Sequence, residues 1–219
     1  MSGVRTGSLA VLLLATVACA DRACGGSGGL PPERLPLVTR GGASYHFLDK
    51  GAWKGYYDEA GRLAIAEYDS TGHGRADTIA HYDADRHIRL IEVDEDLDGW
   101  VDRFEYYDAT GHLEKVGRCR KQRGRADEWI YRGPDGHAAR IEYDDDGDGK
   151  PERADVIQGG VVVRTETDSD RDGRMDRWQY WTAGHLTSEE IDTDGDGKPD
   201  RRLVFGPTGK LVRMERLPR

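Results

Sequence analysis

One ten-residue pattern recurs along this 219-residue chain and constrains its fold more than any other feature. The pattern D-x-D-x-D-G-x-x-[DE]-R appears four times, as DEDLDGWVDR, DDDGDGKPER, DSDRDGRMDR and DTDGDGKPDR. Two degenerate copies, DSTGHGRADT and CRKQRGRADE, keep the same phase. The six copies begin at residues 69, 94, 119, 144, 168 and 192, so the steps are 25, 25, 25, 24 and 24 residues. A fixed period of this size is typical of a chain built from structural repeats.

A second recurring element, a turn marked by glycine, lies between the acidic segments. It reads YYDEAGRL, YYDATGHL, YWTAGHL and VFGPTGKL in four of the units. A polar cluster that ends in glycine between two β-prone runs is typical of a hairpin. Each unit is therefore predicted to be a strand, an acidic loop, a second strand and a glycine turn. The turn glycines are Gly61, Gly111, Gly136, Gly184 and Gly209.

Apolar side chains alternate with polar ones along the predicted strands, with the period of two that a β-strand requires. RFEYY places Phe104 and Tyr106 on one face, and EWIYR and RWQYW repeat the arrangement. At a constant repeat length, these aromatic side chains are expected to stack in register. A helical interpretation fails because the apolar spacing is not three and four.

The predicted fold is all-β, a repeat protein that forms an antiparallel β-meander of hairpins with about 24–25 residues per unit. About 12 to 14 short strands would run from near Tyr45 to Val212, with the acidic loops along one edge and the glycine turns along the other. Because an open twisted sheet rarely exceeds about 10 strands without curling, we expect a strongly curved sheet.

The acidic loops have the composition of a metal site. Carboxylates at loop positions one, three and five converge when the chain turns tightly, and glycine at position six permits the positive φ of such a turn. A carbonyl at position seven, from Trp100, Lys150, Arg174 or Lys198, and an acid at position nine would complete the oxygen cage that Ca²⁺ needs. The predicted side-chain ligands form four sites: Asp94, Asp96, Asp98 and Asp102; Asp144, Asp146, Asp148 and Glu152; Asp168, Asp170, Asp172 and Asp176; and Asp192, Asp194, Asp196 and Asp200.

This spacing resembles the calcium loops of integrin α-subunit propellers, and the resemblance implies Ca²⁺ as the cofactor, with up to four ions. An EF-hand would instead need a glutamate at position twelve and flanking helices. The alternative is a solvated acidic turn without metal. The copy at Cys119 is expected to bind none, because Lys121 and Arg123 occupy ligand positions. In the copy at Asp69, Thr71 and His73 weaken the cage, and whether it binds metal is left open.

Composition excludes some functional classes. A formal net charge of -9 argues against a nucleic-acid partner, which needs a basic face. The chain has no glycine-rich phosphate loop, no H-E-x-x-H and no recognisable nucleophile with its base, so a non-enzymatic protein is expected. His112, His137 and His185 each follow a turn glycine and are expected to be solvated, the alternative being a zinc-binding row.

The N-terminus has the features of an export signal: Arg5, then a short apolar stretch, LAVLLLATV, and small residues. TVAC resembles the lipobox of bacterial lipoproteins, which would make Cys19 the lipidation site, whereas ACA also fits ordinary cleavage and secretion. The predicted organisation is a lipoprotein-type signal peptide at residues 1–18, a flexible tether at 19–44 and the β-hairpin repeat domain at 45–219. Whether Cys24 and Cys119 pair is left open.

The chain as a whole resembles envelope lipoproteins of Gram-negative bacteria that carry DxDGDGxxDR units. That resemblance implies export and anchoring to the outer membrane by lipid, facing the periplasm or the surface, with simple secretion as the alternative. The expected function is structural or adhesive, with a surface protein or a glycan as partner. YYDEAGRL also resembles the YD repeats of toxin shells, so a toxin-associated or immunity protein is the second hypothesis. An enzyme with an unrecognised site is the third.

Overall fold

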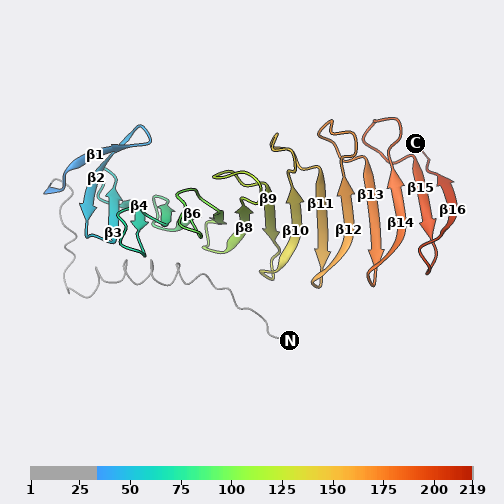
Figure 1. Cartoon of the computed structure of the whole chain (residues 1–219), viewed down its shortest axis with the longest axis horizontal. Helices are drawn as coiled ribbons and strands as arrows, with labels where there is room; N and C mark the ends of the chain where they lie inside the picture. Colours follow the sequence, from blue (N-terminus) through green and yellow to red (C-terminus); the bar gives the residue numbers. More distant parts are fainter. Residues whose placement is uncertain (1–33, 219) are drawn as a thin grey trace. The chain divides into compact units, whose positions relative to one another are not determined.

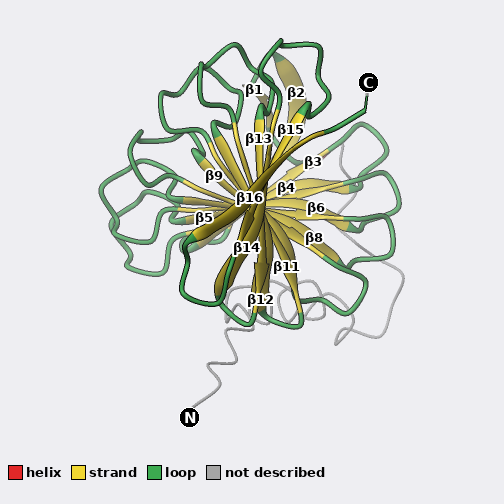
Figure 2. Ribbon diagram, turned by 90° about the vertical axis from the view of Figure 1, so that its right-hand side faces the viewer, coloured by secondary structure: helices red, strands yellow, loops and turns green. Residues whose placement is uncertain are grey.

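The computed structural model describes residues 34–218, which form sixteen β-strands. Figure 2 draws these residues as strands and loops alone. Within this part of the chain, no helix is long and apolar enough to cross a membrane. The predicted signal peptide, the lipidation site Cys19 and the cysteine at position 24 lie outside the described residues.

The chain divides into two compact units, Met1–His87 and Ile88–Arg219. The first unit contains β1 (Leu37–Arg40), β2 (Ala43–Asp49), β3 (Trp53–Tyr57), β4 (Leu63–Tyr68) and β5 (Thr78–Tyr82). The second contains β6 (Ile88–Val93), β7 (Arg103–Tyr107), β8 (Leu113–Arg118), β9 (Glu128–Arg132), β10 (Ala138–Tyr143), β11 (Arg153–Gln158), β12 (Val161–Thr167), β13 (Arg177–Thr182), β14 (His185–Ile191), β15 (Arg201–Phe205) and β16 (Leu211–Arg216). Strand structure therefore begins within the segment predicted to be a tether.

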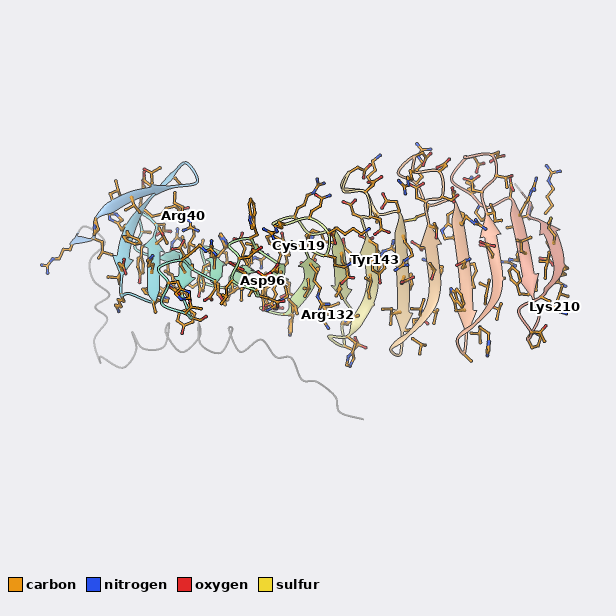
Figure 3. All side chains as sticks on the ribbon, viewed as in Figure 1. Arg40, Asp96, Cys119, Arg132, Tyr143 and Lys210 are labelled. Atoms are coloured by element: carbon orange, nitrogen blue, oxygen red, sulfur yellow. The ribbon has the colours of Figure 1, made fainter. Side chains whose placement is uncertain are left out.

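The strands follow one another in chain order as an antiparallel meander, which confirms the predicted class and topology. In the second unit the acidic loops lie along one edge of the sheet and the glycine turns along the other (Figure 1). Figure 3 shows the same division, with Cys119 and Tyr143 near the loop edge and Arg132 and Lys210 near the turn edge.

The expectation of a strongly curved sheet was wrong: neither unit is strongly curled. The strands of the second unit are rotated progressively relative to one another, so the sheet accommodates eleven of them by twisting (Figure 2). Each of these strands has only five to seven residues. Twist separates neighbouring strands most at their ends, so short strands tolerate it without losing hydrogen bonds.

The repeat period changes from 25 to 24 residues because the turn shortens by three residues while the two strands of the unit together gain two. The earlier units close with five-residue turns such as 108–112, in which the amide of Gly111 donates to the carbonyl of Asp108 at 3.1 Å. The units that begin at Asp144 and Asp168 close with two-residue turns, Gly159 with Gly160 and Ala183 with Gly184. All five predicted turn glycines have φ between 73° and 84°, as the turn prediction requires.

The second unit is a single layer in which strands pack against their chain neighbours. Glutamates consequently lie in the faces of the sheet and are covered by arginines, as a buried carboxylate requires. Arg140 on β10 donates to Glu142 on its own strand at 2.7 Å and pairs with Glu166 on β12 at 2.8 Å. It spans the intervening β11 at Ala154, a small residue with no solvent exposure.

The aromatic side chains do not stack directly on their repeat equivalents. Tyr106 on β7 and Tyr131 on β9 share a row across the sheet, but Lys115 on β8 lies between them in the register. Its ammonium nitrogen lies 4.8 Å from the ring centroid of Tyr106, 4.7 Å from that of Trp129 and 5.9 Å from that of Tyr131. The reason is topological: equivalent strands of consecutive units are two strands apart, so a residue of the return strand separates them.

Gly117 on β8 shows how the large rings are accommodated. A Cβ on Gly117 would lie 2.8 Å from both the Trp129 ring and the Cβ of Ala126, so the ring occupies the space that a side chain would take. In the first unit, Gly55 has the same relation to the ring of Trp53.

We expect Gly117→Ala to destabilise the protein by about 1–3 kcal/mol, because the new methyl group overlaps a packed ring and a buried methyl. Urea unfolding measures the effect. Gly133→Ala is the matched control, because the heavy atom nearest to its new methyl group is a side-chain oxygen of Asp135 at 3.2 Å, and no ring or buried methyl lies closer. Equal destabilisation in the two variants would contradict the packing explanation.

Candidate metal sites along the loop edge

Every copy of the acidic pattern forms a nine-residue loop between two strands: residues 69–77, 94–102, 119–127, 144–152, 168–176 and 192–200. The aspartate at position one anchors the loop by accepting backbone amides with both carboxylate oxygens. In Asp144, Oδ1 accepts from Gly147 at 2.6 Å and Oδ2 from Gly149 at 2.9 Å. Asp168 and Asp192 accept from positions four and six in the same way.

The other acidic positions are also held by amides of their own loop. Asp146 at position three accepts from the amide at position five at 3.1 Å, and Asp148 at position five accepts from the amide at position seven at 2.7 Å. The acid at position nine reaches back to position two, as where Oδ2 of Asp102 accepts from the amide of Glu95 at 2.7 Å. These donors offset part of the repulsion between the carboxylates, so the loop is shaped by its own backbone.

Burial and amide contacts act on these carboxyls in opposite directions. Burial by itself would raise the pKa of Asp192, but the amides of Gly197 and Gly195 outweigh it and hold the pKa below its usual value. The same balance lowers the pKa of Asp69 to about 2. The anchoring aspartates of these two loops are therefore charged at neutral pH.

Four acidic clusters in the second unit could hold metal ions. In each, one carboxylate oxygen from every member lies within 4.8 Å of the others. The clusters are Asp94, Asp96 and Asp102; Asp144, Asp146, Asp148 and Glu152; Asp168, Asp170 and Asp176; and Asp192, Asp194 and Asp200. The structure thus brings together thirteen of the sixteen predicted side-chain ligands, and Asp98, Asp172 and Asp196 stand outside their clusters.

Two position-nine acids of these clusters have a buried oxygen that makes no hydrogen bond among the described residues. Asp176 uses Oδ2 to accept from Ser169 at 3.1 Å, whereas its Oδ1 is buried and has no hydrogen-bond partner among the described residues. Oδ1 of Asp200 is likewise buried without a hydrogen bond, and the Nε atom of Arg201 lies 3.9 Å away. A buried, charged oxygen without a partner is costly, and a bound cation would satisfy it.

The degenerate loop 119–127 keeps the frame but replaces the acidic cluster with cations. Asp127 at position nine still accepts from the amides of Arg120 and Lys121, at 3.0 and 2.6 Å. Arg123 extends to the preceding loop and pairs with Oδ2 of Asp98 at 3.2 Å. Lys121 pairs with Asp145 of the following loop, and this contact lowers the pKa of Asp145.

Neighbouring loops in the second unit pack on one another through a glycine. The ring of Trp100, at position seven, lies against Gly124, at position six of the next loop, 3.1 Å from where its Cβ would be. Arg125 lies against Gly149 and Lys150 against Gly173 in the same way. The glycine is therefore needed for lateral packing as well as for its positive φ, which the one-loop sequence pattern does not reveal.

Position four also adopts a left-handed conformation, a constraint that the sequence analysis missed. Two loops have glycine there, Gly147 and Gly195, with φ of 81° and 74°. Leu97 and Arg171 occupy the equivalent positions with φ of 66° and 62°, in a region that costs side-chain-bearing residues about 1–2 kcal/mol. The glycines at position four in two of the four acidic loops could have predicted this conformation from the sequence.

The turn histidines do not form a metal site. None of the metal-compatible groups among residues 34–218 includes a histidine, and the turn residues His112, His137 and His185 are exposed. Two position-ten arginines make charge contacts: Arg177 pairs across strands with Glu189 at 2.7 Å, and Arg103 pairs with the loop residue Glu95 at 2.6 Å.

Comparison with known proteins identifies no family for this chain. No family model matches it, and no curated protein matches it. Among solved structures, the chain is similar to one described as the GtfA/B complex bound to UDP and GlcNAc, with 14% identity, a TM-score of 0.31, and coverage of 66% of this chain and 27% of the other. A second, accessory secretory protein 1,2 and 3 in Streptococcus pneumoniae, gives 12% identity, a TM-score of 0.30, and coverage of 60% and 22%. The chain thus spans about a quarter of these structures, and similarity at this level says nothing of function.

We expect Arg171→Gly to stabilise the protein by about 0.5 kcal/mol, because relief of the left-handed strain exceeds the entropy cost of glycine. Arg174→Gly, three residues later in the same loop, lacks that relief and should lose about 0.5–1 kcal/mol. Chemical denaturation of both variants without metal measures the difference. Equal destabilisation would show that position four carries no strain.

Proposed function

We propose that the protein is a calcium-binding repeat lipoprotein of the bacterial cell envelope, with a structural or adhesive role and no enzymatic activity. The observation that carries the proposal is the set of four acidic clusters at equivalent places along one edge of the second unit. In this proposal each cluster holds one Ca²⁺ ion. Asp98, Asp172 and Asp196 complete their sites when the ion draws them in.

The donor set supports calcium over other metals. Every side-chain ligand is a carboxylate, and hard oxygen donors without nitrogen or sulfur suit Ca²⁺, Mg²⁺ or Mn²⁺. Calcium accepts six to eight oxygens in flexible geometry, whereas magnesium demands a near-ideal octahedron and keeps much of its water. A nine-residue loop with several carboxylates and backbone carbonyls fits the calcium requirement better.

The electrostatics indicate what the ions would do for the protein. The loops of the second unit each join two strands at the same edge, and loops 94–102, 119–127, 144–152 and 168–176 pack laterally through their position-six glycines. Charged clusters in neighbouring loops repel one another unless they are neutralised. Bound calcium would remove that repulsion and stiffen the loop edge.

The location is inferred from the sequence. The export signal and the lipobox-like TVAC support anchoring to a membrane through lipid on Cys19, and an exported protein meets millimolar calcium. A stiff array presented from an anchor suits a scaffold or an adhesin, with a surface protein or a glycan as partner.

Calcium should bind with a stoichiometry of up to four ions, and Asp176→Asn should remove one of them. Free calcium at 100 times Kd stabilises the folded state by about 2.7 kcal/mol per site. Isothermal titration calorimetry of the chelator-treated protein gives the count, and protease resistance of residues 94–200 with calcium or with EGTA reports the stiffening.

Asp127→Asn is the matched control, because Asp127 holds the same loop position in the degenerate copy. It should weaken its loop without changing the calcium count. Absence of binding at millimolar calcium would refute the proposal. Loss of one ion in both variants would show that position nine acts on folding alone.

Arg123→Ala should strengthen calcium binding at the site of Asp94, because it releases Asp98 from an ion pair that competes with the metal. Arg123 is exposed, so the pair is worth less than about 1 kcal/mol and the gain should be at most about fivefold in Kd. Lanthanide luminescence excited through Trp100, which lies in that loop, selects this site. Unchanged affinity would mean that Arg123 does not compete with the ion.

A further inference from the structure

An open cavity of about 390 Å³ lies in the second unit, where the aromatic face of the sheet meets two loops. That volume is within the range of small-molecule sites. Phe104 and Tyr106 of β7, Trp129 and Tyr131 of β9 and Glu142 of β10 form its base, while Arg125 and Ala126 of loop 119–127 and Asp144 and Pro151 of loop 144–152 form its sides. Neither the calcium proposal nor the repeat pattern requires a cavity at this place.

The hollow exists because small residues alternate with large rings. On β8, Gly117 has no side chain and is covered by the Trp129 ring, and Ala126 beside it is buried. The rings of Tyr106 and Trp129 lie 5.8 Å apart, with the Lys115 ammonium within 5 Å of both centroids. Cation–π contacts of this kind hold the rings in place. The aromatic wall is therefore preorganised before any ligand arrives.

Polar groups surround this wall, and hydrogen bonds hold two of them in place. Glu142 accepts from Nε of Arg140 at 2.7 Å and from the hydroxyl of Tyr131, a phenol that burial and this hydrogen bond keep neutral by raising its pKa to about 12. Asp144 is buried and held by two loop amides. Arg125, on the opposite loop, is exposed and has its guanidinium beside Gly149. The cavity thus combines an aromatic platform with carboxylate acceptors and a guanidinium donor.

We propose that this cavity binds a pyranose unit of a glycan. A sugar ring has an apolar face of C–H groups that stacks on an aromatic ring and a rim of hydroxyls that donate to carboxylates and accept from a guanidinium. Half-buried rings beside Glu142 and Arg125 offer both kinds of contact. A lipid chain would instead need an enclosed apolar cavity, and a nucleic acid would need a basic face around it, whereas two carboxylates line this one.

The site rests on the proposed function and deepens its adhesive role by naming a class of partner, while the aromatic rings, Glu142 and Arg125 belong to no acidic cluster. Asp144 is the one cavity residue that also belongs to an acidic cluster. Calcium in loop 144–152 would fix that wall of the cavity, so saccharide binding should be tighter with calcium than with EGTA.

The test is titration of the full-length protein, in millimolar calcium, with methyl pyranosides of glucose, galactose, N-acetylglucosamine and glucuronic acid. Ligand-observed NMR and calorimetry report binding. We expect at least one saccharide to bind, and Arg125→Ala and Glu142→Gln each to weaken it by tenfold or more. Arg174→Ala is the matched control, because it removes an exposed arginine from the same position of a loop that does not line the cavity.

The outcomes separate this inference from the proposed function. Saccharide binding that is lost in the Arg125 and Glu142 variants and kept in the Arg174 variant supports the site. Binding that survives both cavity variants lies elsewhere and overturns it, as does the absence of binding by all four saccharides. Calcium binding that persists when no saccharide binds leaves the proposed function intact and refutes the glycan site alone.

Discussion

Hydrogen bonding and side-chain packing between neighbouring strands stabilise the second unit, because no other layer covers its sheet among the described residues. A strand in such a sheet can bury its side chains only against the strands beside it. Fully buried aliphatic residues are consequently few, and Ile91 is the one large side chain below 2% exposure among residues 34–218. Long side chains take the place of a second layer, and Arg140 covers Ala154 while it neutralises Glu142 and Glu166. Arginine and glutamate are thus structural residues in this chain, and its high charge does not conflict with an ordered fold.

The loop edge presents the opposite electrostatic situation, with negative charge gathered in place of balanced pairs. Backbone amides bind the first aspartate of a loop through both oxygens and so allow the loop to form, but amides do not cancel a net charge. The compensating positive charge has two sources along the edge. Loop 119–127 supplies it from the protein itself, through Lys121 and Arg123, which contact the loops on either side. The four acidic loops would obtain it from solution, which makes their stiffness dependent on the environment.

Loss of the acidic pattern in loop 119–127 coincides with the cavity beside it. The loop has no metal cluster, yet Gly124, Arg125 and Ala126 line the hollow over β7 to β10. A repeat that no longer has to hold an ion can vary its loop residues while neighbouring units maintain the sheet. The degenerate copy and the proposed glycan site thus belong to the same unit, whose loop lines the cavity and has no acidic cluster.

The sequence by itself determined the repeat length, the strand–loop–strand–turn unit, the edges on which loops and turns lie, and the acidic residues that cluster. Each of these depends on residues within one unit: alternation in RFEYY, a glycine that permits positive φ, and carboxylates two positions apart. Tertiary structure alone decided what depends on neighbouring units. The intervening strand places Lys115 between the aromatic rows, Trp100 lies against Gly124 of the next loop, Arg123 pairs with Asp98 of the preceding loop, and twist keeps the sheet open. The two contacts between loops join residues 24 and 25 positions apart, and no single-unit pattern records which side chains the twist of the sheet will bring together.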